Sequence, residues 1–143
     1  MADLQSWGDE WLAAFNAHDE ARIAALSAEH GRIVAPGDVE LDGRAAVTGY
    51  AMAWLSAFPD ATVTATNQVT ADPWVVQEFV FEGTHTATLQ TPAGEIPPTG
   101  RRLTGRGAQV VRVENGGAVE TQLYFDQVQV MTQLGLMPEP ATA

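Results

Sequence analysis

The stretch that decides the fold is LTGRGAQVVRVENGGAVETQLYFD, residues 103–126. Two runs rich in β-branched and aromatic residues flank the dipeptide Asn115-Gly116, which is typical of a two-residue hairpin turn. The sequence therefore predicts an antiparallel pair of strands, near residues 102–114 and 118–129.

The register of this hairpin predicts a pocket. A two-residue turn pairs Glu114 with Gly117 and, counting outward, Gly105 with Asp126, unless a β-bulge shifts the register. Residues two apart in a strand share a face. One face would then carry Gly105, Gly107, Gln109, Gln122, Tyr124 and Asp126. Because two glycines opposite an acid and a tyrosine leave empty volume, we expect a pocket there rather than a packed core.

Asp126 is the main candidate for chemistry. It follows Leu123-Tyr124-Phe125 and precedes the apolar-rich segment Val128–Leu136, so we expect an acid in hydrophobic surroundings. A carboxyl group placed in this way suits acid/base catalysis near neutral pH. The alternative is structural, because Asp126 could instead cap a helix that begins near Val128 or pair with an arginine.

An earlier strand, near residues 74–85, supplies the second candidate. Alternation places Val75, Gln77, Phe79, Phe81, Gly83 and His85 on one face. Glu78 and Glu82 lie on the other face, which we expect to contact water. His85 is therefore predicted to point inward, at the end of an aromatic row.

The first 60 residues show helical periodicity. We expect helices over about Asp3–Ala17 and Asp19–Glu29, joined near His18, and a third helix that stops at Pro59. On the third helix, Trp54 and Phe58 lie beside the apolar stripe and can line a pocket. Further strands are predicted near residues 62–70 and 86–91. Helices followed by a mostly antiparallel sheet indicate an α+β fold.

Composition limits the class of protein. The chain has 143 residues, 45% of them hydrophobic, which predicts one globular domain over residues 1–138 and a flexible tail over 139–143. Its 18 acidic and 7 basic residues give a net charge of -11, so nucleic acid and anionic membrane surfaces are poor partners. There is no cysteine, and the three histidines are too scattered for a metal-ligand motif. With no basic, apolar leader at the N-terminus, we expect a cytoplasmic protein.

Several motifs occur in an order that resembles the SnoaL-like polyketide cyclases, within the nuclear transport factor 2-like superfamily. They are Phe81-Glu82-Gly83-Thr84-His85, Pro97-Pro98-Thr99-Gly100-Arg101, Arg112-Val113-Glu114-Asn115-Gly116, Tyr124-Phe125-Asp126 and Gln133-Leu134-Gly135-Leu136, with Phe58-Pro59-Asp60 before them. The resemblance extends from about Leu4 to Pro138. It implies a cone-shaped α+β barrel with a deep cavity, and homodimers formed through the sheet.

The resemblance also implies a function. An aspartate at the position of Asp126 would act as general acid/base in aldol-type ring closure of an aromatic or polyketide-like ester, without metal or other cofactor. His85 matches the family's Gly-x-His element. The founding cyclases have a histidine on the strand before the aspartate, whereas this chain has none, and Gln109 or Arg112 could replace it.

The predicted site therefore has two catalytic residues, Asp126 and His85. The predicted substrate-binding residues are Tyr124, Gln109, Gln122, Phe79, Phe81, Trp54, Phe58, Gly105 and Gly107. Two alternatives to the cyclase remain. One is another proton-transfer enzyme of the superfamily, an isomerase or hydrolase, and the other is a non-catalytic protein that binds small molecules or associates through its surface.

Overall fold

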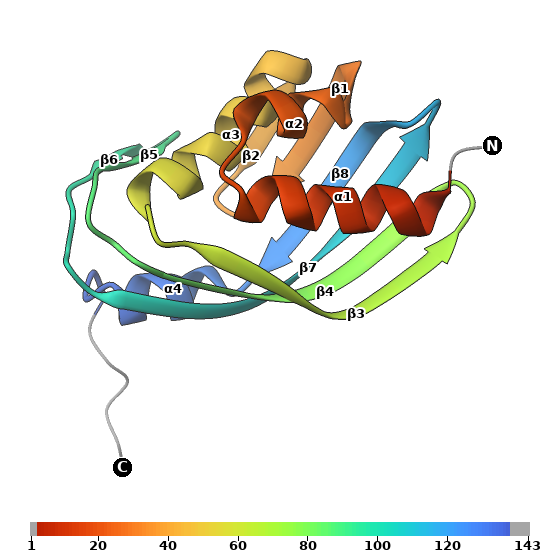
Figure 1. The fold of residues 1–143 in the computed structure, drawn as a ribbon. Helices are drawn as coiled ribbons and strands as arrows, with labels where there is room; N and C mark the ends of the chain where they lie inside the picture. The colour runs from red at the N-terminus through yellow and green to blue at the C-terminus, as the bar shows by residue number, and fades with distance from the viewer. Residues whose placement is uncertain (1–2, 138–143) are drawn as a thin grey trace.

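The structure is a computed structural model, and it describes residues 3–137. The chain forms helices and a curved sheet in an α+β arrangement (Figure 1). The helices are α1 (Leu4–Asn16), α2 (Glu20–Ala25), α3 (Arg44–Ala57) and α4 (Gln127–Gln133). The strands are β1 (Ser27–Ala35), β2 (Val39–Asp42), β3 (Thr62–Ala71), β4 (Trp74–Thr84), β5 (Leu89–Thr91), β6 (Gly94–Ile96), β7 (Arg102–Glu114) and β8 (Gly117–Phe125).

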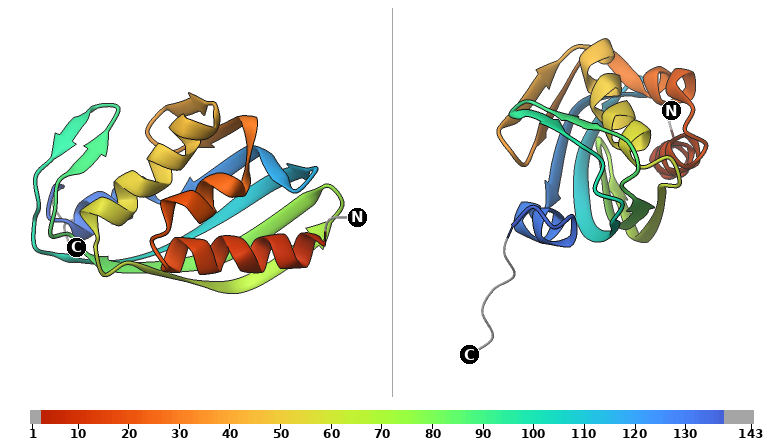
Figure 2. Two further views of the ribbon diagram at one scale, coloured as in Figure 1. Left: turned by 45° about the horizontal axis from the view of Figure 1, so that its top comes forward. Right: turned by 90° about the vertical axis from the view of Figure 1, so that its left-hand side faces the viewer.

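Six strands form one sheet in the order β2-β1-β8-β7-β4-β3, and β5 and β6 form a separate hairpin. All neighbours in the large sheet are antiparallel except β1 and β8. The sheet curves around α1, α2 and α3, which lie on one side of it (Figures 1 and 2). Val130 and Leu134 of α4 join the core between these layers. The predicted cone-shaped α+β fold is confirmed.

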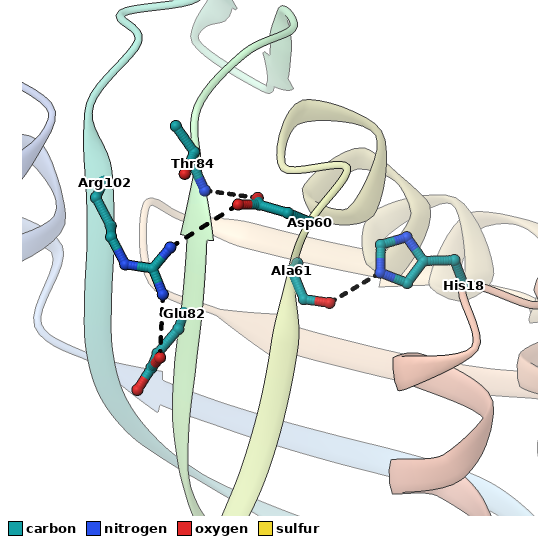
Figure 3. Close-up of polar contacts among 6 residues, drawn as sticks. All are labelled: His18, Asp60, Ala61, Glu82, Thr84 and Arg102. Carbon is teal, nitrogen blue, oxygen red and sulfur yellow. Dashed lines mark hydrogen bonds and ion pairs between the residues drawn. The ribbon is translucent and has the colours of Figure 1, made fainter.

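The first helix and the start of the second agree with the sequence prediction. Asp3 caps α1 by accepting hydrogen bonds from the backbone N–H groups of Gln5 and Ser6. His18 joins α1 to α2 with a positive φ of 54°, and its Nε2 lies 2.9 Å from the carbonyl oxygen of Ala61 (Figure 3). The predicted joint near His18 is therefore confirmed.

The second helix is shorter than predicted. It ends at Ala25, and residues 27–35, of which the first three were assigned to it, form β1. Only Ile33 and Val34 in this strand have strong β propensity, so local sequence gives a weak strand signal. Pairing with both β2 and β8 determines the structure instead. The predicted strand at 86–91 is confirmed only over residues 89–91, which form β5 and pair with β6 in a hairpin.

A β-bulge changes the register of the hairpin formed by β7 and β8. Glu114 pairs with Gly117 as predicted, but Arg112 pairs with Glu120 and Val113 with Ala118, which leaves Val119 unpaired. A shift of one residue exchanges the two faces of a strand. On the pocket side, Gly107 consequently lies opposite Phe125 and Gln109 opposite Leu123. Asp126, Tyr124 and Gln122 do not share that face, so the predicted register beyond the bulge was wrong.

A polar clamp holds the corner after α3 against the sheet. Asp60 Oδ1 accepts a 2.7 Å hydrogen bond from the Thr84 N–H, which holds the pKa of that carboxyl below its usual value. Arg102 lies between Asp60 and Glu82, at 3.8 and 3.1 Å (Figure 3). These ion pairs are half-exposed, so each contributes about 1 kcal/mol or less to stability.

Candidate functional site

A cavity of about 140 Å³, partly open to solvent, lies between the helices and the concave face of the sheet. This volume is close to the roughly 150 Å³ of an engineered cavity that binds benzene. Its lining is mainly apolar. The aromatic residues that line it are Trp7, Trp11, Phe15, Tyr50, Trp54, Phe79, Phe81 and Phe125. The cavity therefore suits a flat, hydrophobic ligand, and its opening leaves room for a larger one to extend outward.

Trp54 of α3 is central to this aromatic wall. Its ring packs edge-to-face on Phe81 and Phe125, with centroids 5.9 and 5.7 Å away, and stacks on Phe58 at 5.9 Å. Such pairs contribute about 0.5–1.5 kcal/mol each beyond burial. Because each ring is held by others, the wall is preorganised for a ligand.

Two buried glutamines form a polar patch in this apolar surface. Gln109 of β7 donates from Nε2 to Oε1 of Gln77 on β4 at 2.7 Å. Gln77 in turn donates to the carbonyl oxygen of Gly8, at 3.0 Å, and to Oε1 of Gln68, at 2.7 Å. Both side chains line the cavity and are at least nine-tenths buried. The patch can orient a polar group of a bound ligand.

Tyr50 adds a hydroxyl group from α3. Burial raises the pKa of its phenol, an effect that the Trp54 indole opposes. The phenol therefore stays protonated through the neutral range and is a hydrogen-bond donor. A donor in a cavity of low polarity can stabilise negative charge that develops on a ligand oxygen.

Asp126 does not lie where the sequence predicted. It is exposed, and its Oδ1 accepts a 3.0 Å hydrogen bond from the Gln129 N–H, which makes it the N-cap of α4. The expectation of a buried acid was wrong, because the bulge turns this end of β8 over, and the alternative that Asp126 caps a helix is confirmed. Asp126 nevertheless lies between two cavity-lining residues, Phe125 and Val130.

His85 points inward as predicted, with 0% of its surface exposed. Its ring stacks on Phe58 with centroids 5.2 Å apart. Nδ1 accepts from the Thr99 N–H at 3.2 Å and lies 3.0 Å from Thr99 Oγ1. Burial lowers the pKa of the imidazole, an effect that the backbone at Ala87 opposes, and so favours the neutral ring. His85 is not among the cavity-lining residues, and it holds the segment after β6 in place.

The structure brings part of the predicted binding set together. Trp54, Phe79, Phe81, Gly105 and Gln109 line the cavity. Phe58 is fully buried behind Trp54, and Gly107 packs against Phe79 instead of opening the cavity.

The remaining predicted residues lie elsewhere. By register, Gln122 and Tyr124 lie on the outer face of the sheet, where Tyr124 is 56% exposed. Arg112 shares that face and forms ion pairs with Glu114 and Glu120, so it does not replace the missing histidine in the cavity.

Sequence reasoning missed the role of Gln77. The signal was present, because Gln77 is the one amide in the inward row of β4. Its hydrogen-bond partners are Gly8, which is distant in sequence on α1, and Gln68, which lies on β3. The sequence therefore could not predict this hydrogen-bond network.

Together, these elements form a cone-shaped α+β domain with an internal cavity. The family model of the SnoaL-like polyketide cyclases matches residues 8–134, and the chain belongs to this family. No curated protein sequence matches the chain.

Solved structures agree with this assignment. IdmH from Streptomyces antibioticus, a candidate polyketide cyclase, is 26% identical over 94% of this chain and 99% of its own, with a TM-score of 0.76. AclR from Streptomyces galilaeus, a candidate hydroxylase, is 22% identical over 97% of this chain and 89% of its own, with a TM-score of 0.78. TsrD from Streptomyces laurentii has a TM-score of 0.80 at 20% identity, over 96% of this chain and 100% of its own. The last two likenesses concern the fold alone. No helix within residues 3–137 is long and apolar enough to cross a membrane.

Proposed function

We propose that the protein is an enzyme that closes a ring in an aromatic, polyketide-like ester by an aldol reaction. The observation that carries the proposal is the aromatic cavity, with a protonated tyrosine and an oriented amide pair in its wall, in a chain of the SnoaL-like family.

The chemistry needs few groups. A carbon between a ketone and an ester loses a proton to a base, and the resulting enolate carbon attacks a second carbonyl carbon of the same molecule. A C–C bond forms, the C=O π bond of the attacked group opens, and its oxygen takes up a proton. Tyr50 would donate a hydrogen bond to the enolate oxygen, and such a donor contributes about 10²–10³-fold to the rate.

Asp126 is the proposed base. Its Oδ1 is used in capping α4, which leaves Oδ2 for proton transfer. Phe125 and Val130, one residue before and four residues after it in the chain, both line the cavity, so we place the reacting end of the substrate at this edge of the cavity. A positioned acid/base group contributes about 10²–10⁴-fold. His85 would act through the segment that it holds, without contacting the substrate.

A synthetic ester tests this proposal. The substrate is a methyl acetoacetate joined through its terminal carbon to a benzene ring that carries an ortho acetyl group. Aldol closure and loss of water convert it into a naphthol ester, which is followed by absorbance. We expect closure faster than in buffer, and a rate about 10²-fold lower in Tyr50→Phe. Closure at the buffer rate, with the ester bound, would contradict the proposal.

That negative result would favour a second function, a binding protein without catalysis. One observation supports it: within the part of the chain that the structure describes, neither an acid nor a histidine is among the cavity-lining residues. The same ester distinguishes the two, because a binding protein holds it without converting it.

We also propose that the protein is a homodimer formed through the outer face of the sheet. Val69, Val76 and Val110 form a continuous apolar row across β3, β4 and β7 by register. Val69 is 51% exposed in the single chain. Phe125 does not contribute to this face, because it lines the cavity. An apolar row of this kind on a sheet is a typical association surface.

A further inference from the structure

We infer that the side-chain oxygen of Gln109 selects ligands that carry a phenol or enol hydroxyl, because a chain of hydrogen bonds fixes the direction of its amide. The inference rests on the proposed function only in taking the cavity as the substrate site. It concerns which polar group of the ligand is accepted at the glutamine patch.

The chain of amides is anchored at α1. Gln68 donates from Nε2 to the Asp9 carboxylate, at 3.2 Å, and to the carbonyl oxygen of Gln5, at 3.3 Å. Gln77 donates from Nε2 to the carbonyl oxygen of Gly8, at 3.0 Å. Carboxylate and backbone carbonyl oxygens only accept hydrogen bonds. The nitrogens of both amides must therefore face α1.

The anchored amides determine the direction of the third. With its nitrogen committed to Gly8 and Gln68, Gln77 has only Oε1 left to face Gln109. The 2.7 Å contact is favourable only if Gln109 presents its nitrogen. The reverse orientation would bring two carbonyl oxygens together in a buried site, which is costly.

The oxygen of Gln109 is thus left for a ligand. None of the hydrogen bonds within residues 3–137 uses Oε1 of Gln109. The buried side-chain atoms without a partner in the described chain are Trp7 Nε1, Thr48 Oγ1 and His85 Nε2, and Gln109 Oε1 is not one of them. It therefore contacts accessible space, and the cavity that Gln109 lines provides that space.

An acceptor in an apolar wall discriminates between ligands. A hydroxyl group placed there forms a hydrogen bond, whereas an ether or ketone oxygen meets another acceptor and leaves both unpaired. Phenols and enols of aromatic polyketides carry this donor. Gln109 is a binding residue in this scheme, and Gln77 is a positioning residue that acts through it.

Calorimetric titration with three probes of nearly equal shape tests the inference. The probes are naphthalene, α-naphthol and the methyl ether of α-naphthol. We expect the wild-type protein to bind α-naphthol roughly 10-fold more tightly than the ether. Gln109→Met should remove this preference while naphthalene still binds, and Gln77→Met should weaken it by freeing the Gln109 amide to turn. Gln90→Met, an exposed change on β5, should leave the preference intact.

The outcomes separate this inference from the proposed function. Equal binding of α-naphthol and its ether by the wild-type protein, or tighter binding of the ether, would overturn the inference. This comparison needs no variant, so it holds even if Gln109→Met fails to fold. If none of the three probes binds, the cavity is not the substrate site, and the proposed function fails.

Discussion

Gly105 allows the cavity to be filled at little cost. A Cβ atom built on Gly105 would contact only Leu103 Cδ1, at 3.9 Å, and the backbone there lies outside the left-handed region. Gly105→Ala should therefore stabilise the protein by about 0.4–1 kcal/mol, because alanine restricts the unfolded chain. For a chain of this size the melting temperature should rise by roughly 1–4 °C. The larger Gly105→Leu should occupy the cavity and weaken the binding of naphthalene.

Gly107 provides the matched control, two residues along the same strand. A Cβ atom there would lie 2.7 Å from Phe79 Cζ and 2.8 Å from the Tyr124 carbonyl oxygen. Since the sheet fixes that carbonyl, Gly107→Ala should cost about 1–3 kcal/mol through overpacking.

Thermal denaturation followed by circular dichroism measures the effects on stability, and calorimetry measures the affinity for naphthalene. Equal destabilisation by the two alanine changes, or unchanged naphthalene binding by folded Gly105→Leu, would refute the placement of the cavity.

Three further predictions concern the rest of the molecule. Asp126→Ala should lower the free energy of unfolding by about 1 kcal/mol through loss of the helix cap. Asp126→Asn should keep most of that stability but lose ring closure. Normal turnover of the synthetic ester by Asp126→Asn would exclude Asp126 as the base. Because the pKa of His85 is lowered in the folded state, its contribution to stability is present above the unfolded value of about 6.5 and is lost as the pH falls below it. Denaturant titrations should show this loss of stability as the pH falls from about 7 into the acid range, and the loss should be smaller in His85→Asn. The same pH dependence in both proteins would argue against a contribution of His85. Light scattering should give a dimer mass for the wild-type protein and a monomer mass for Val110→Glu, and a wild-type monomer would contradict association through the sheet.

Local periodicity was sufficient for much of the fold. The alternation along β4 correctly placed Glu78 on the outer face and His85 inside, because strand phase depends only on neighbouring residues. The first helix and its joint at His18 likewise follow from local apolar spacing and capping.

Features that depend on distant contacts could not be predicted. No sequence pattern predicts the β-bulge opposite Arg112 and Val113. This bulge determines whether Asp126 or Phe125 faces the cavity. Strand β1 forms because β8 and β2 flank it, although its first three residues were predicted to continue the second helix. The direction of the Gln109 amide depends on Gly8, about one hundred residues earlier in the chain.

A crystal structure of the protein with α-naphthol would test the central claim most directly. We predict density for the ring in the cavity beside Trp54 and Phe81, with its hydroxyl oxygen about 2.7–2.8 Å from Gln109 Oε1. An empty cavity at a saturating concentration of the probe, or density only on the outer surface, would contradict the claim that this cavity is the binding site.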